Sequence, residues 1–297
     1  MQIGMIGLDT SHCEIFTKLL NDKSDPFHIP GAKVVKAIPF YSPELSISAD
    51  RVGHFTTLLR DNYNVELVED LAEFCSELDG ILITAVDGST HLDWLKKIAP
   101  FGLPVFIDKP IALSSEDVKE IRGIAEIHRI QVMSSSSLRY ADELVKAMNS
   151  IKDSSIQSAY IYGPLPMQEG IRGYFWYGIH MLELAFAMMG NNVQTVEVER
   201  FKHYELCRLT YDGGRSAVIH GDYNMHGRFG FVAHTPSNTL SAELWKDEKP
   251  YYAGLLEKII DFFQTGIPPV SLQETQKLIE IIEDINRKRE YGHDSAY

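Results

Sequence analysis

The sequence has little cysteine and no long apolar run. Its three cysteines, Cys13, Cys75 and Cys207, are scattered over 297 residues without the paired spacing of a disulfide framework or a metal site. We therefore expect a reducing compartment, the cytoplasm, and no metal. No apolar stretch approaches the roughly 18 residues that a membrane span needs. The first residues form an apolar strand pattern rather than a signal peptide, so we expect no membrane partner.

Positive charge is also in short supply. Lys and Arg number 28 against 41 Asp and Glu, which gives a net charge of −13. Because nucleic acids and anionic membranes repel an acidic surface, this balance disfavours both as partners. A small-molecule partner stays open, since a local basic site can lie in an acidic protein. The chain is long enough for one large or two ordinary domains.

The first 135 residues alternate short apolar runs with helical patterns. Residues 80–85 read as a buried strand, residues 91–99 as a helix and residues 104–107 as the next buried strand. Such a crossover is right-handed and sets its two strands parallel. We therefore predict an α/β fold in which residues 1–135 form a Rossmann-type, doubly wound parallel sheet that serves as a dinucleotide-binding domain.

The second half changes to an α+β pattern. Several strand-like runs follow one another between residues 193 and 244, and Asp212-Gly213-Gly214 is a hairpin signal between two of them. Consecutive strands with short turns predict a mainly antiparallel sheet. We expect residues 136–297 to form a substrate and oligomerisation domain with closing C-terminal helices. Because the exposed face of such a sheet commonly pairs with a copy of itself, we expect a homo-oligomer.

The turn after the first predicted strand lies where a dinucleotide fold places its phosphate loop. It reads Gly-Leu-Asp-Thr-Ser-His from Gly7, so Asp9 and His12 occupy the second and third glycine positions of the usual fingerprint. Asp9 would bring negative charge to the phosphates. The free N–H groups and the dipole of the following helix would favour them, although Ser11, as the N-cap, would already take one of those N–H groups. No acid for the ribose follows the second strand at Pro39. We expect weak binding of NAD or NADP, which Asp9→Gly tightens.

Two further stretches are candidates for chemistry. Lys109 follows the strand at 104–107, at the sheet edge where ligands of parallel sheets bind, although a surface lysine in a loop is an equal alternative. His180 and Glu183 share one face of an apolar helix. They could form an oriented general base, or His180 could be a core histidine satisfied by Glu183. His91 is more simply the first residue of a helix.

The order of these features resembles the glucose–fructose oxidoreductase / inositol dehydrogenase / MocA-like (Gfo/Idh/MocA) family over nearly the whole chain. Asp108-Lys109-Pro110 is similar to the Glu-Lys-Pro motif of that family, and Gly178-Ile-His180-Met-Leu-Glu183 to its Gly-x-His-x-x-Asp motif. The segment from Thr265 to Pro269 is similar to its closing Thr-Gly-x-x-Pro turn. Arg139 resembles the arginine that opens the interdomain helix.

The resemblance implies NAD(P)-dependent hydride transfer on a sugar, a cyclitol or a related hydroxy compound. It makes Lys109 the polarising residue and His180 the proton donor or acceptor, with Glu183 beside it as a third catalytic residue. The cofactor-binding residues would be Gly7, Asp9, Thr10, Ser11, His12, Ala85, His91, Asp108 and Lys109. The substrate-binding residues would be Lys109, Arg139, Trp176 and His180.

Two other functions stay open. A protein that has lost the cofactor would be a sugar-sensing or sugar-binding member, which Asp9, His12 and Pro39 favour. A lyase or isomerase would use Lys109 and His180 to move protons without net redox change. Nicotinamide absorbance or fluorescence in the purified protein distinguishes these functions from the oxidoreductase.

Overall fold

The computed structural model describes residues 1–151, 155–224 and 228–291, and the chain folds into two compact units. Unit 1 contains Met1–Ser135 and Tyr252–Gln276, and unit 2 contains the described parts of Ser136–Tyr251 and Lys277–Tyr297. The stretch Tyr252–Gln276, which the sequence placed with the second half, thus clusters with the first. The reason is packing. A side chain on Gly80 would collide with the ring of Phe263, so the helix that contains Phe263 lies directly against the sheet.

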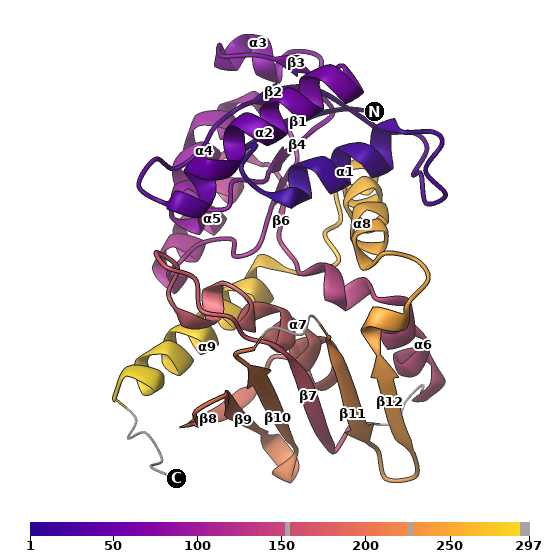
Figure 1. Cartoon of the computed structure of the whole chain (residues 1–297), viewed down its shortest axis with the longest axis vertical. Coiled ribbons are helices and arrows are strands. Elements are labelled where there is room, and N and C mark those ends of the chain that lie inside the picture. Colours follow the sequence, from indigo (N-terminus) through magenta and orange to yellow (C-terminus); the bar gives the residue numbers. More distant parts are fainter. Residues whose placement is uncertain (152–154, 225–227, 292–297) are drawn as a thin grey trace. The chain divides into compact units, whose positions relative to one another are not determined.

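Unit 1 is the predicted parallel sheet with its helices (Figure 1). The strand order is β3-β2-β1-β4-β5-β6, and every neighbouring pair is parallel, which confirms the doubly wound α/β fold. The strands are β1 (Gln2–Ile6), β2 (Lys33–Ile38), β3 (Glu66–Leu67), β4 (Gly80–Ile83), β5 (Val105–Ile107) and β6 (Val132–Met133). The helices are α1 (Ser11–Asn21), α2 (Ser46–Tyr63), α3 (Leu71–Cys75), α4 (His91–Ile98), α5 (Ser115–His128) and α8 (Tyr251–Thr265), with short 3-10 turns η1 (Gly88–Thr90) and η2 (Ala99–Phe101).

The strand register brings three loops to one edge of this sheet. Ile6 at the end of β1 pairs with Ile83 at the end of β4, which pairs with Ile107 at the end of β5. Backbone bonds continue past the strands, from Thr84 N–H to the Ile6 carbonyl (2.8 Å) and from Asp108 N–H to the Ile83 carbonyl (2.9 Å). The loops after β1, β4 and β5 therefore lie where parallel sheets bind their ligands.

Unit 2 holds a mixed sheet in the order β12-β11-β7-β10-β9-β8. Its pairs are antiparallel except β7 with β10, and the Asp212-Gly213-Gly214 turn joins β9 to β10 as a hairpin. The strands are β7 (Ser158–Pro164), β8 (Val193–Arg200), β9 (Tyr204–Tyr211), β10 (Ser216–Asp222), β11 (Gly230–His234) and β12 (Thr239–Glu243). The helices are α6 (Asp142–Ile151), α7 (Gly178–Met189) and α9 (Leu272–Tyr291), which begins in unit 1, with 3-10 turns η3 (Ser137–Tyr140), η4 (Gly173–Phe175), η5 (Asp212–Gly214) and η6 (Leu244–Lys246).

Helix α7 packs on β7 and β10, which explains why this helix is apolar nearly all round. Among the residues that the structure describes, we find no helix with both the length and the hydrophobicity to cross a membrane.

Candidate active site

The turn after β1 depends on the glycine that the sequence retains. Gly7 has a φ of +95°, and a Cβ on it would collide with the backbone of Ala85. Its N–H donates to the Ile38 carbonyl (3.1 Å), and its carbonyl accepts from the Thr84 hydroxyl (2.7 Å). The loop after β1 is thereby fixed against the loop after β4, as in the tight turn of a dinucleotide fold.

Helix α1 begins directly after this turn, and its cap differs from the expected one. Thr10, in an extended conformation, is the N-cap residue, and its side chain accepts from the His12 N–H (3.5 Å). Ser11 is the first helical residue and is exposed. The positive end of the helix dipole faces the sheet edge, because the turn leads straight from β1 into α1.

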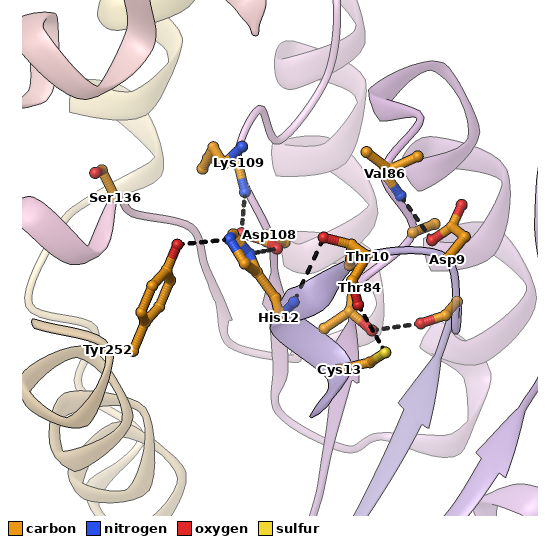
Figure 2. A network of polar contacts seen from close by, with 12 residues as sticks. Asp9, Thr10, His12, Cys13, Thr84, Val86, Asp108, Lys109, Ser136 and Tyr252 are labelled. Carbon is orange, nitrogen blue, oxygen red and sulfur yellow. Dashed lines mark hydrogen bonds and ion pairs between the residues drawn. The ribbon is translucent and has the colours of Figure 1, made fainter. Parts of the chain in front are cut away.

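Asp9 is fully buried, and its carboxylate is held by donors of the protein. Its two oxygens accept from the Val86 N–H (3.0 Å) and the Ser48 hydroxyl (2.6 Å), and Figure 2 shows Asp9 directed at Val86. Ser48 in turn accepts from the Ser42 N–H (2.8 Å), so the loops after β1, β2 and β4 are joined. Burial raises the pKa of Asp9 to about 6, although these hydrogen bonds oppose the shift.

His12 joins three segments that are far apart in the sequence. Its Nδ1 contacts the Asp108 carboxylate, and its Nε2 lies 2.9 Å from the hydroxyl of Tyr252 in the first turn of α8 (Figure 2). His12 and Asp108 are both buried. Burial opposes ionisation of Asp108, but the charges of His12 and Lys109 hold its pKa below the ordinary value. Tyr252 could not be recognised from the sequence, because its partner lies 240 residues away.

Lys109 lies beside this network. Its backbone N–H donates to Asp108 Oδ1 (2.7 Å), which anchors the loop after β5, and its side chain is partly buried. Burial lowers the pKa of Lys109, and the charge of Asp108 opposes that shift. A lysine in such surroundings is a candidate for chemistry rather than an ordinary surface residue.

His91 joins the loops after β4 and β5. Its ring is fully buried, with Nε2 2.8 Å from the Ala85 carbonyl and Nδ1 3.2 Å from the Ile111 carbonyl. Burial lowers its pKa, and a neutral ring can donate to only one of the two carbonyls at a time. His91 is the first residue of α4, as the sequence predicted. Its hydrogen bond to the Ala85 carbonyl fixes the loop after β4.

The second candidate group lies in unit 2, around His180 in α7. His180 Nδ1 is 2.7 Å from the hydroxyl of Ser136, which also accepts from the Leu138 N–H (3.2 Å). The Glu183 carboxylate accepts from the Ser136 N–H (3.2 Å) and forms an ion pair with Arg139. The sequence missed Ser136, because four consecutive serines indicate a solvated loop, whereas Ser136 is fully buried.

The remaining predicted substrate residue also belongs to unit 2. Trp176 follows η4, is partly exposed and has its ring 5.6 Å from that of Tyr177. The Tyr177 ring meets the His180 ring edge-on at 5.7 Å. Lys109 lies in unit 1 and His180 in unit 2, so their action on one ligand stays a prediction.

Comparison with known proteins shows which proteins this chain is similar to. Residues 3–136 match the GFO_IDH_MocA family model, an oxidoreductase family with an NAD-binding Rossmann fold. Over these residues the chain is similar to that family. The match confirms the resemblance found in the sequence. A rhizopine catabolism protein MocA from Rhizobium meliloti is 28% identical over 96 residues, which span 32% of this chain and 30% of that protein.

Solved structures extend the likeness of fold to the whole chain. A putative myo-inositol dehydrogenase from Sinorhizobium meliloti superposes with a TM-score of 0.79 at 14% identity, covering 99% of this chain and 98% of that one. An apo scyllo-inositol dehydrogenase from Lactobacillus casei gives 0.77 at 14% identity, covering 97% and 95%. GenD2 of gentamicin A biosynthesis, solved with NAD, gives 0.77 at 14% identity, covering 99% and 95%. At such identities these matches show the fold alone.

Proposed function

We propose that this protein is an NAD(P)-dependent oxidoreductase that transfers a hydride to or from a sugar, a cyclitol or a related hydroxy compound. The observation that carries the proposal is the edge of the parallel sheet in unit 1. There the nucleotide-binding domain of an oxidoreductase family presents a tight glycine turn and a partly buried lysine whose pKa is lowered. The names of the structural relatives, which include inositol dehydrogenases, support the substrate class.

The residues present fit the pyrophosphate end of a dinucleotide. Gly7 has the positive φ that the turn requires, and α1 starts at Ser11 with its dipole toward the turn. The carboxylate of Asp9 is directed at Val86 and Ser48, so its hydrogen bonds lie on the protein side of the loop. We propose that the backbone from Gly7 to His12 binds the pyrophosphate. Because the loop after β2 begins with Pro39 and Phe40 and supplies no acid there, we expect little preference between NAD and NADP.

The two basic residues take separate tasks in this proposal. The nicotinamide, when bound, accepts or gives the hydride. Lys109 as an ammonium donates a hydrogen bond to the reacting oxygen of the substrate and so polarises it. His180 exchanges the proton of that oxygen, and the Ser136 hydroxyl on Nδ1 holds its ring. Buried Glu183, which is paired with Arg139, accepts from the Ser136 backbone N–H, and we therefore assign Glu183 the task of supporting His180.

Calorimetric titration with NADH and NADPH tests the proposal first. Binding of either nucleotide, followed by reduction of NAD or NADP in the presence of inositols and simple sugars, is the expected result. A protein that binds neither nucleotide is no oxidoreductase of this kind. In that event the family fold serves a sugar-binding protein, or a lyase or isomerase that uses Lys109 and His180 without redox change.

The sheet of unit 2 supports a second part of the proposal, a homo-oligomer. Buried residues of β7 and β10, such as Ile161 and Ile219, alternate with residues that are exposed or partly exposed. The alternate positions carry aromatic side chains. Tyr160 is 41% exposed, and its ring centroid lies 6.1 Å from the ring centroids of both Tyr162 and His220. A second copy of the chain would cover these rings. Light scattering of wild type and Tyr160→Glu tests this, and identical masses would remove the assignment.

A further inference from the structure

The turn before α7 packs against both α7 and α9 in unit 2. It runs from Gly173 to Tyr177, and His180 follows in the first turn of α7. The Tyr174 ring is fully buried and packs on Gly178, where a Cβ would lie only 2.3 Å from a ring carbon of Tyr174. Gly178 has to be a glycine, because a side chain there would push Tyr174 away.

Asn286 of α9 holds the backbone of this turn from its other side. Asn286 is only 1% exposed; its Oδ1 accepts from the Tyr174 N–H (3.0 Å), and its Nδ2 donates to the Arg172 carbonyl (3.3 Å). Gly173 between them has a φ of +47°, and a Cβ on it would lie 2.2 Å from Asn286 Oδ1. One buried amide thus satisfies backbone groups on both sides of a left-handed glycine, which fixes the path of the chain.

The end of α9 is itself anchored on the sheet of unit 2. Arg289, three residues after Asn286, donates from Nε to both oxygens of Glu205 on β9 (3.0 and 2.9 Å). Glu205 is fully buried and also accepts from the Tyr223 hydroxyl (2.7 Å). Because breaking a buried ion pair leaves an uncompensated charge, these contacts keep Asn286 in place.

The turn carries two rings that lie beside His180. Trp176 and Tyr177 are both partly exposed, and their ring centroids are 5.6 Å apart. The Tyr177 ring meets the His180 ring edge-on at 5.7 Å, and the Tyr177 carbonyl accepts from the His180 N–H (3.1 Å). Aromatic side chains with a few polar groups among them are the usual lining of a small-molecule site.

We propose that Asn286 is a positioning residue for the substrate, because it holds the turn that carries Trp176 and Tyr177. The two rings then lie beside His180 before the substrate arrives. This rests on the proposed function for the task of the rings. A site that is assembled in only about a tenth of the molecules binds its substrate about tenfold more weakly. Release of the turn should therefore raise KM by about that factor.

Hydrogen exchange followed by mass spectrometry tests the hold on the turn without nucleotide or substrate. In wild type the N–H groups of Tyr174, Phe175 and Trp176 are all hydrogen-bonded, so a peptide that spans them should exchange slowly. Asn286→Leu has nearly the same volume and removes both hydrogen bonds of the amide. The peptide should then lose its protection, whereas α7 should keep its own. A residue that served only overall stability would speed exchange in both segments.

Two further variants separate the turn from the rest of α9. Glu290→Gln removes the exposed pair of Glu290 with Arg172 (2.8 Å) and should leave the exchange of the turn unchanged, because exposed pairs contribute little. Gly178→Ala pushes on Tyr174 from the opposite side and should release the same peptide. If Asn286→Leu does not fold, the result of Gly178→Ala decides.

Steady-state kinetics tests what the turn does for the substrate. Initial rates with NAD and increasing concentrations of myo-inositol give KM and kcat for wild type, Asn286→Leu and Glu290→Gln. KM should rise in Asn286→Leu alone, and kcat should stay within about twofold of wild type, because the assembled site brings the same reacting groups to the substrate.

The proposal is overturned if the wild-type peptide exchanges as fast as an unstructured chain, if Asn286→Leu leaves its protection intact, or if kcat falls while KM is unchanged. Failure of the proposed function would look different. Wild type would then bind neither NADH nor NADPH, whereas Asn286→Leu would still open the turn.

Discussion

Asp9→Asn should make the folded protein more stable at neutral pH. Burial raises the pKa of Asp9 from 3.8 to about 6, so the folded state binds this proton more tightly than the unfolded state does. The stabilisation that protonated Asp9 provides is complete below pH 3.8 and is lost as the pH rises through about 6. The difference between these two pKa values corresponds to about 3 kcal/mol of stability.

The asparagine side chain can replace the protonated acid at this position. Its oxygen can accept from the Val86 N–H, and its amide can donate to the Ser48 hydroxyl, which are the two groups that Asp9 contacts. The variant should therefore gain up to about 3 kcal/mol at pH 7.5 and lose the dependence on pH between 4 and 6. Urea unfolding of both proteins at pH 4.5, 5.5, 6.5 and 7.5 measures this difference.

A surface variant provides the control. Asp93 lies on the exposed side of α4, and Asp93→Asn removes the same charge without a burial effect. We expect its stability to stay within about 0.5 kcal/mol of wild type, as for most surface substitutions. If Asp9→Asn is instead less stable than wild type at pH 7.5, the hydrogen bonds to the ionised carboxylate outweigh its burial, and the assigned direction of the pKa is wrong.

The other predictions concern backbone strain and catalysis. Gly7→Ala should destabilise the fold by more than Gly31→Ala, because both glycines have φ above +90° but only a Cβ at Gly7 meets other atoms; equal urea midpoints would contradict this. Lys109→Ala and His180→Ala should each lower turnover by a factor of roughly 10² to 10⁴, measured as nucleotide reduction once a substrate is found, and near-normal rates would make both residues structural. Ser136→Ala should shift the limb of the pH–rate profile that reports His180, whereas a purely structural serine would leave that limb in place.

Much of the fold could be predicted from the sequence. Short apolar runs between helical patterns indicated the parallel sheet, because strands buried on both faces are apolar throughout. The hairpin at Asp212-Gly213-Gly214 followed from turn chemistry. Lys109 and His180 were predicted from short sequence motifs and from the order of these motifs along the chain, both of which can be recognised without knowing the fold.

The contacts of these residues could not be predicted, because they depend on partners far along the chain. The direction of the Asp9 carboxylate is set by Ser48 and Val86, 39 and 77 residues away. From the sequence we expected that Asp9→Gly tightens nucleotide binding. The substitution would also destabilise the loop, because glycine would leave the Ser48 hydroxyl and the Val86 N–H without this acceptor. Tyr252 and Ser136 were missed for the same reason, since a tyrosine at a helix start and a serine in a polar tract carry no sign of a histidine partner.

The division of the chain has a consequence for how the protein is made. Unit 1 consists of Met1–Ser135 and Tyr252–Gln276, so the ribosome synthesises more than a hundred residues of unit 2 between its two parts. Until α8 has emerged, Gly80 lacks the Phe263 ring that packs on it, and His12 lacks the Tyr252 hydroxyl. Until residue 263 has been synthesised, the part of β4 at Gly80 therefore lacks its cover and stays exposed to water, which is the kind of transient apolar surface that chaperones bind.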